Sequence, residues 1–237
     1  MENTVRLNKY IAECGICSRR EADRLIEAKR VQVNGATATT GMQVGYKDLV
    51  TVDGKKISKA SDKIVLAYYK PVGVTCTEKD RYAEITVKDV LDYPIRVTYA
   101  GRLDKESEGL LLMTNDGDLI NSLMKGSNGH EKEYLVKVNK EIPGNFKEKM
   151  ECGVFLKELG KVTKECSVEI LGPYTFRIVL KQGLNRQIRR MCESQGLKVI
   201  GLKRIRVANI ELGKLKVGTY RRIVGEELNK LYECVKN

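Results

Sequence analysis

One stretch of the chain, residues 101–117, constrains the fold most strongly. It opens with Gly-Arg-Leu-Asp at 101–104, continues through an apolar run at 110–113, and closes on Asn-Asp-Gly at 115–117. A short apolar run between two turn signals is typical of a strand buried inside a sheet. The stretch also places a carboxylate, Asp104, in the turn directly before that strand. Such an acid is either a candidate nucleophile or base, or a surface group that hydrogen-bonds its own turn.

The length and the cysteines narrow the class of protein. With 237 residues the chain can form one large or two modest domains. Seven scattered cysteines do not indicate a disulfide framework and fit a reducing compartment. Cys14 and Cys17 form a Cys-x-x-Cys pair, but no second pair follows at zinc-ligand spacing and His130 is the only histidine. We therefore expect no metal and no cofactor, with Cys14 packed as a small apolar residue at a helix end.

The N-terminus lacks a hydrophobic signal region, and no apolar run reaches the length of a membrane span. We therefore expect a cytoplasmic protein that does not bind membranes.

The net charge of +12 is concentrated in one segment. Residues 177–222 contain 13 Lys or Arg but only two acids, Glu193 and Glu211. So dense a positive charge favours a surface that binds a polyanion such as a nucleic acid. The alternative is a face that only keeps the protein in solution.

The first sixty residues form a unit of their own. Apolar residues at 7, 10, 11 and 14 share one face of a helix, and Ser18 with Glu21 has the spacing of a capping box for a second helix. Short strands are predicted at 31–33 and 49–52, each followed by a turn signal, Asn-Gly and then Asp-Gly. The polar faces of the two helices carry five basic residues that suit a polyanion, Arg6, Lys9, Arg19, Arg20 and Arg24.

This unit resembles the S4 RNA-binding domain over about residues 5–55. The resemblance lies in Arg-Leu-x-Lys at 6–9, Ser-Arg-Arg-Glu-Ala at 18–22 and Val-x-Val-Asn-Gly at 31–35. It implies that the helix pair docks on structured RNA through contacts with the RNA backbone.

Beyond a polar linker the chain is rich in strands, with helices interspersed. Strands are predicted at 64–69, 110–114, 134–138 and 176–180, and a helix opens at 116–118. A further helix is predicted to begin with Asn185 as its N-cap and Arg186 at its first helical position, and to stop at Gly196.

Three polar residues in this part are candidates for chemistry: Asp104, Tyr134 at the start of a strand, and Arg186 at the start of a helix. Each has a plainer alternative, because turn acids usually hydrogen-bond at the surface, helix-start arginines are usually solvated, and strand-start tyrosines usually edge a core.

The motifs together resemble the RsuA/RluB/RluE/RluF family of pseudouridine synthases, most closely the RluF branch. They are Lys-Pro-x-Gly at 70–73, the stretch 101–110, Lys-x-Tyr at 132–134, the stretch 182–191, and Gly-x-x-Arg at 218–221. The resemblance implies an α+β protein. An S4 domain at 1–58 and a linker at 59–63 precede a catalytic domain at 64–237, which is built on a mixed, mostly antiparallel sheet with flanking helices.

The resemblance also implies the chemistry, in which uracil is detached from the ribose, rotated and rejoined through C5. Asp104 would be the nucleophile, attacking either the sugar or the base. Arg186 would supply the charge that keeps this carboxylate ionised in a dry site, and Tyr134 would stack on the uracil. The residues implied to contact RNA are Arg102, Leu103, Lys105, Leu184, Asn185, Gln187, Arg189, Arg190 and Leu202.

We expect the substrate to be ribosomal RNA, with large-subunit 23S rRNA ahead of small-subunit 16S rRNA and a tRNA as a second substrate, and we expect a monomer. A non-catalytic S4-type RNA-binding or ribosome-assembly factor would explain the charge, but it does not explain Asp104, Tyr134 and Arg186 together. An S4-bearing tRNA synthetase is disfavoured because the chain has no nucleotide-binding signature.

Overall fold

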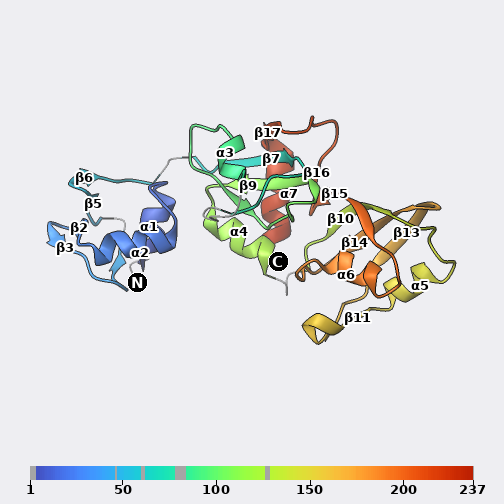
Figure 1. Cartoon of the computed structure of the whole chain (residues 1–237). Helices are drawn as coiled ribbons and strands as arrows, with labels where there is room; N and C mark the ends of the chain where they lie inside the picture. The colour runs from blue at the N-terminus through green and yellow to red at the C-terminus, as the bar shows by residue number, and fades with distance from the viewer. Residues whose placement is uncertain (1–3, 46, 60–61, 78–83, 126–128, 237) are drawn as a thin grey trace. The chain divides into compact units, whose positions relative to one another are not determined.

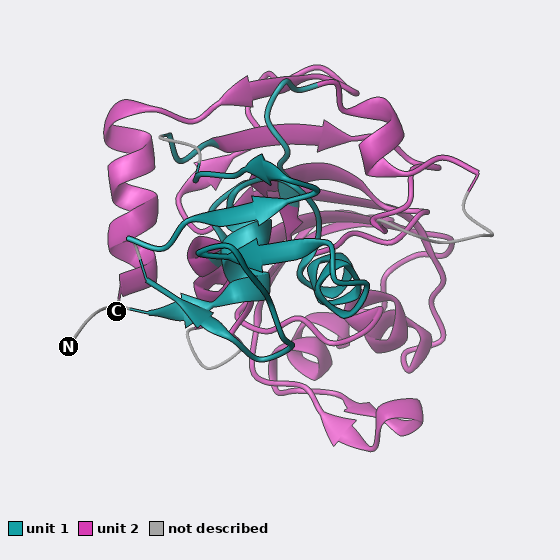
Figure 2. Ribbon diagram, turned by 90° about the vertical axis from the view of Figure 1, so that its left-hand side faces the viewer, with its two compact units in different colours: residues 1–64, 93–98, 115–117 teal, residues 65–92, 99–114, 118–237 magenta. Residues whose placement is uncertain are grey.

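The computed structural model describes residues 4–45, 47–59, 62–77, 84–125 and 129–236. The chain forms two compact units (Figure 2), which we call unit 1 (residues 1–64, 93–98 and 115–117) and unit 2 (residues 65–92, 99–114 and 118–237). The α+β class expected from the sequence is confirmed in both units. The expected linker, 59–63, includes residues 60–61, which lie outside the described residues.

In its described residues, unit 1 has two helices and a small sheet that share one apolar core (Figure 1). The sheet is antiparallel in the order β3-β2-β5-β6, and β1 pairs separately with β4. The elements are β1 (Val5–Arg6), α1 (Leu7–Glu13), α2 (Arg19–Glu27), β2 (Val31–Val33), β3 (Ala36–Thr37), β4 (Gln43–Val44), β5 (Val50–Val52) and β6 (Lys55–Lys56).

The turn signals of unit 1 act as predicted. Ser18 caps α2 by accepting a hydrogen bond from the Glu21 backbone N–H at 3.3 Å. Asn34 and Gly35 both have positive φ, 52° and 84°, as the two-residue turn between β2 and β3 requires. The polar stretch after residue 54 still belongs to unit 1, because β6 extends the sheet there and Ile57 is buried in the core.

Unit 2 is built on a sheet that is nine-stranded within the described residues. The order is β13-β14-β10-β15-β9-β7-β17, with β16 paired to β15 and β8 paired to β9. Among the pairs that define this order, only β15 with β9 is parallel, so the predicted mixed, mostly antiparallel sheet is confirmed. Its strands are β7 (Val65–Lys70), β8 (Thr98–Ala100), β9 (Glu108–Thr114), β10 (Lys132–Val138), β13 (Ser167–Gly172), β14 (Thr175–Leu180), β15 (Val199–Val207), β16 (Ile210–Glu211) and β17 (Tyr220–Arg222).

Two apolar clusters hold helices against this sheet. One cluster joins β10, β14 and β15 to α5 (Phe146–Glu151) and α6 (Gln187–Glu193). The other joins β7 and β9 to α4 (Gly117–Met124) and α7 (Gly225–Lys236). Between α5 and β13 in the chain, β11 (Phe155–Leu156) and β12 (Lys161–Val162) form a separate short hairpin (Figure 1). The remaining elements are α3 (Val87–Val90) and η2 (Lys157–Leu159).

The strand predicted from residues 110–114 is β9, and it lies between β15 and β7 in the sheet. Its three leucines are completely buried, which confirms the buried strand expected from the apolar run. Gly109 lets β15 approach closely at the start of β9, because a Cβ there would lie 2.2 Å from the Arg204 carbonyl oxygen. The Asp104 turn is therefore attached to the centre of the sheet.

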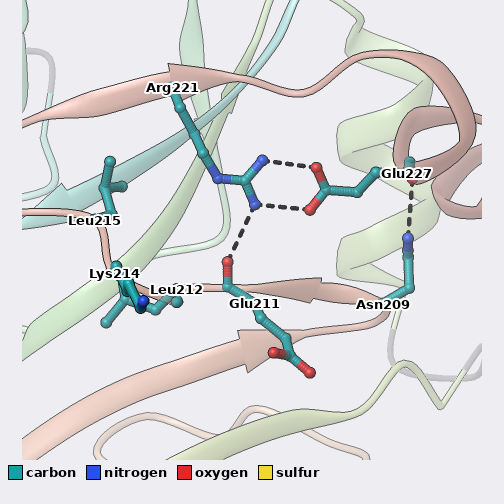
Figure 3. A pocket seen from close by; sticks show the side chains of 8 residues that line it. Asn209, Glu211, Leu212, Lys214, Leu215, Arg221 and Glu227 are labelled. Atoms are coloured by element: carbon teal, nitrogen blue, oxygen red, sulfur yellow. Dashed lines mark hydrogen bonds and ion pairs between the residues drawn. The ribbon is translucent and has the colours of Figure 1, made fainter.

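Arg221, from the Gly-x-x-Arg motif, joins the last elements of unit 2 (Figure 3). Its guanidinium pairs with both carboxylate oxygens of Glu227 on α7, at 2.6 and 2.7 Å, and donates to the Glu211 carbonyl on β16 at 3.2 Å. Asn209 donates to the Glu227 carbonyl at 2.9 Å. This motif residue therefore ties β17, β16 and α7 together.

Candidate active site

Asp104 lies in a cleft of about 470 Å³ in unit 2. Most of its lining comes from the turn before β9, the start of β10, the middle of β15, and the connection from β14 into α6, and Thr75, Cys76 and Met124 complete it. A volume in this range fits one small-molecule-sized group, such as a single nucleotide lifted from a strand. The three residues expected to carry the chemistry, Asp104, Tyr134 and Arg186, all line it.

Two guanidinium groups lie near the Asp104 carboxylate. Arg186 Nη1 is 3.8 Å and Arg189 Nε is 3.7 Å from Asp104 Oδ2. These are ion-pair distances, and within the described residues neither group makes a hydrogen bond to that carboxylate. Both cations therefore lie within ion-pair distance of one oxygen, Oδ2, and the carboxylate still lines the cleft.

The start of α6 differs from the prediction. Asn185 is not the N-cap and Arg186 is not the first helical residue: Arg186 itself is the N-cap, and α6 begins at Gln187. Arg186 adopts the left-handed conformation, with φ 50° and ψ 33°. This backbone turn is sparsely populated for residues other than glycine, and such conformations cluster at functional sites. The Asn185 side chain instead accepts a hydrogen bond from Arg190 Nη2 at 3.3 Å.

Arg189 is the more firmly held of the two cations. Its side chain is 8% exposed, against 39% for Arg186. Arg189 Nη2 donates to the Glu106 carbonyl at 3.3 Å and to Ser107 Oγ at 3.1 Å. The sequence indicated Arg189 only as an RNA contact, since the spacing along α6 does not reveal which arginine turns inward.

A buried lysine is hydrogen-bonded to the turn that carries Asp104. Lys70, at the end of β7, is completely buried, and its Nζ donates to the Pro71 and Ser107 carbonyls, both at 2.7 Å. Burial lowers the pKa of Lys70 to about 8. The Lys105 carbonyl also accepts from the Gly73 backbone N–H at 2.8 Å. The turn is therefore fixed by its own backbone, which leaves the Asp104 side chain available.

Arg204, on β15, is a second buried cation that contacts the turn carrying Asp104. It is buried, and its Nε donates to the Leu110 carbonyl at 2.7 Å while Nη1 reaches the Arg102 carbonyl at 3.5 Å. Its Nη2 is buried and has no hydrogen-bond partner among the residues that the structure describes. Lys132, also in the cleft wall, has its pKa lowered by burial and then by the charge of Arg204. The inner wall of the cleft is thus cationic.

The residues expected to contact RNA divide into three groups. Arg102, Leu103, Lys105, Leu184, Asn185, Gln187, Arg189 and Leu202 line the cleft with Asp104. Arg190 is not among the lining residues and forms an ion pair with Glu158. The cations of unit 1, Arg6, Lys9, Arg19, Arg20 and Arg24, form a separate set on that unit, where Lys9 pairs with Glu13 at 3.5 Å and Arg24 with Glu21 at 3.2 Å.

Sequence reasoning did not identify Lys70, Lys132 or Arg204 as parts of the site. Lys70 and Lys132 stand in motifs that carried the family resemblance, so their positions were signalled but not their roles. Arg204 carries no such signal, because β15 was not predicted as a strand. It becomes apparent only when the parallel pairing sets Arg204 opposite Gly109.

Cys14 packs against the core of unit 1, and burial raises its pKa to about 11. Among the described residues no group of three or more His, Cys, Asp or Glu side chains could hold a metal ion. None of the helices in the described part of the chain is long and apolar enough to cross a membrane.

The comparisons with known proteins agree with this geometry. Residues 64–194 match the family model described as RNA pseudouridylate synthase, and residues 5–49 match that of the S4 domain. The chain belongs to the RNA pseudouridylate synthase family, and it carries an S4 domain ahead of the catalytic domain. The family membership expected from the motifs is confirmed.

Three individual proteins are similar to this chain over nearly its whole length. The chain is 47% identical over 238 residues to the dual-specificity RNA pseudouridine synthase RluF of Escherichia coli, covering 100% of this chain and 81% of that protein. It is 39% identical over 242 residues to ribosomal large subunit pseudouridine synthase B of Vibrio cholerae, covering 98% and 75%. A crystal structure of a pseudouridylate synthase superposes with a TM-score of 0.71 at 28% identity, covering 96% of this chain and 99% of that one.

Proposed function

We propose that this protein converts a uridine of large-subunit ribosomal RNA to pseudouridine, with Asp104 as the nucleophile. The observation that carries the proposal is the Asp104 carboxylate, open to the cleft between Arg186 and Arg189. A carboxylate nucleophile needs an oxygen that can reach the substrate, and the two arginines orient the Asp104 side chain by ion pairs at 3.7 and 3.8 Å without hydrogen bonds to it.

The reaction breaks the bond from ribose C1′ to uracil N1 and forms a bond from C1′ to C5 of the rotated base. The proton on C5 is then lost and N1 takes up a proton, so the product is an isomer of the substrate. Asp104 attacks either C1′ of the ribose or C6 of the base, and both routes fit a carboxylate with open oxygens. Tyr134 stacks on the uracil and assists the removal of the C5 proton. Leu202 provides apolar contact for the base.

The target nucleotide has to leave its stack to reach Asp104, which costs a few kcal/mol. Arg102 and Lys105 flank the nucleophile and contact the RNA backbone, and Leu103, Leu184, Asn185 and Gln187 complete the wall against the flipped nucleotide. The cations of unit 1 bind structured RNA through its phosphates. Phosphate contacts of this kind offset the cost of flipping.

The choice of RNA rests on relatives that act on the large subunit, as the name of the Vibrio cholerae protein states. A tRNA is a second substrate to test, because the Escherichia coli relative is described as having dual specificity. A ribosomal RNA substrate places the protein in the cytoplasm, and the cleft lies within one unit of one chain, so we propose that it acts as a monomer.

Mapping of pseudouridines in total RNA tests the proposal. Cells that lack the protein should lose pseudouridine at a uridine of large-subunit rRNA, and the site should return when the wild-type chain is supplied. Loss only in small-subunit rRNA would contradict the choice of target. No change in any RNA would contradict the proposed function.

A further inference from the structure

The hairpin of β11 and β12 extends from the rest of unit 2, as Figures 1 and 2 both show. The two strands are antiparallel, with Phe155 opposite Val162 and Leu156 opposite Lys161, and η2 closes the tip. The hairpin is not part of the cleft that contains Asp104.

The base of the hairpin is firmly anchored. The Val154 backbone N–H donates to Thr163 Oγ1 at 2.9 Å, and the Thr163 N–H donates to the Val154 carbonyl at 2.9 Å. Leu156 is buried in the core shared with α5 and α6. Its strand neighbour Phe155 therefore points to the opposite face of the hairpin.

That outer face is apolar and exposed. Phe155 is 55% exposed and Val162, its cross-strand neighbour, is 63% exposed. The other two phenylalanines of the chain, Phe146 and Phe176, are completely buried, with ring centroids 5.0 Å apart. An exposed aromatic ring on an anchored hairpin is a suitable platform for another flat apolar group.

The surroundings of the platform are cationic. Lys157, Lys161 and Lys164 are exposed, and within the described part of the chain none of them forms an ion pair. Two acids lie among these lysines along the chain: Glu158, at the tip, forms an ion pair with Arg190, and Glu165 is exposed next to Lys164. An aromatic surface surrounded by unpaired lysines is complementary to a nucleic-acid strand, in which bases stack and phosphates carry the charge.

The hairpin is also connected to the rim of the cleft. Arg190, which pairs with Glu158, donates through Nε to the Asn185 carbonyl at 3.0 Å and through Nη2 to its side chain. Asn185 lines the cleft and precedes Arg186. A strand whose nucleotide enters the cleft can therefore continue along α6 toward the hairpin.

We propose that this hairpin is a second RNA contact, at which an unpaired base of the substrate RNA stacks on Phe155 and Val162 while Lys157, Lys161 and Lys164 bind its phosphates. The proposal rests on the proposed function, since it takes the substrate to be RNA. It differs from that function in assigning a contact outside the cleft.

Equilibrium binding to a transcribed, unmodified fragment of large-subunit rRNA tests the stacking. Phe155→Ala should weaken binding about tenfold, since stacking on an aromatic ring contributes at that level, and Phe155→Tyr should bind like the wild type. Tyr174→Ala is the matched control, because Tyr174 is an exposed aromatic residue of the turn between β13 and β14 and should leave affinity unchanged. Wild-type affinity in Phe155→Ala would overturn the proposal.

The three lysines are tested separately, by the salt dependence of RNA binding. Replacement of Lys157, Lys161 and Lys164 by Gln should reduce the slope of log affinity against log salt by about 2, as expected for three lost contacts to single-stranded phosphates. An unchanged slope would overturn this part.

Sedimentation without RNA distinguishes the alternative occupant: a wild-type dimer that Phe155→Ala abolishes would show that the platform binds a second copy of the chain.

The two proposals fail in different ways. If the wild type binds the fragment but forms no pseudouridine in it, the proposed function fails while the binding comparison still decides the hairpin. If the wild type forms pseudouridine and Phe155→Ala binds equally well, only the hairpin proposal fails.

Discussion

The Asp104 carboxylate lies between two arginines that differ in how firmly they are held. Arg189 is fixed by backbone and hydroxyl acceptors in the turn itself, whereas Arg186 is half-exposed at the cap of α6 and also lies 3.3 Å from Glu106 Oε2. Arg189 is therefore the buried, hydrogen-bonded charge of the pair, whereas Arg186 is the more exposed one and lies within ion-pair distance of both Asp104 and Glu106.

Replacing Arg186 by Gln should lower the rate of pseudouridine formation about a hundredfold, a typical loss when one preorganised charge is removed from a site. The fold should be unaffected because Arg186 is partly exposed. Single-turnover kinetics at saturating RNA measure the rate. Arg222→Gln, which removes an exposed cation of β17 outside the cleft, is the control and should react like the wild type.

Lys70 gives the clearest pH dependence. Burial lowers its pKa to about 8 from the ordinary 10.5, so between those values the unfolded chain binds more protons than the folded protein. Raising the pH through this window therefore stabilises the fold, and the neutral amine can still donate to both carbonyls. The stability of the wild type relative to Lys70→Met should increase from about pH 8 to about pH 10, by at most about 1.4 kcal/mol per pH unit.

Chemical denaturation of both proteins across this pH range measures the difference. The variant should be less stable at every pH, because two buried carbonyls lose their donor. A difference that does not change with pH would mean that Lys70 titrates like a lysine in water.

At the scale of elements, the parallel pairing of β15 with β9 is what assembles the cleft. It sets Arg204 opposite Gly109 at the start of β9, and the antiparallel pairing of β10 with β15 sets Tyr134 opposite the same Arg204. The pairing depends on Gly109, whose φ of 108° and close approach to Arg204 exclude a side chain.

Gly109→Ala should therefore destabilise the protein by about 2–4 kcal/mol, since it combines backbone strain with a steric clash. Gly144→Ala is the matched control, because a Cβ there meets no atom within 4 Å and its φ is not positive. Thermal unfolding compares the two. Equal stability of both variants would show that β15 can move away from β9 at little cost.

The sequence predicted those elements whose signals are local. The apolar run at 110–114, the Asn-Gly turn after 33 and the cap at Ser18 all depend on neighbouring residues, and all three are confirmed. The start of α6 was predicted one residue too early, because an Asn before an apolar helix face resembles an N-cap while the left-handed turn at Arg186 has no side-chain signal. The strand β15 was not predicted, since its Lys and Arg residues conceal a partly buried strand.

At the scale of the whole molecule, the positive charge is divided between the units. Unit 1 carries Arg19, Arg20 and Arg24 on α2, whereas unit 2 carries the cations around the cleft. The concentration of charge in 177–222 was visible in the sequence. The sequence did not show which of these cations are buried around Asp104 and which are exposed. In the structure Arg189 and Arg204 are buried, whereas Lys181 and Lys198 are exposed.

RNA affinity should therefore fall steeply as salt rises, with a contribution from each unit. Replacing Arg19, Arg20 and Arg24 by Gln should reduce the slope of log affinity against log salt by about 2 to 3, while the rate at saturating RNA stays unchanged. Filter binding over a salt series measures the slope. A flat response in the wild type would mean that these cations only solubilise the protein.

The account depends most on Asp104. Asp104→Asn keeps the shape of the side chain and removes its charge, so the purified variant should bind unmodified rRNA at least as well as the wild type. The decisive measurement is the pseudouridine formed by this variant in a transcribed large-subunit rRNA fragment, beside the wild type at the same saturating concentration. We predict pseudouridine with the wild type and none with Asp104→Asn; full conversion by the variant would contradict the assignment of Asp104 as the nucleophile.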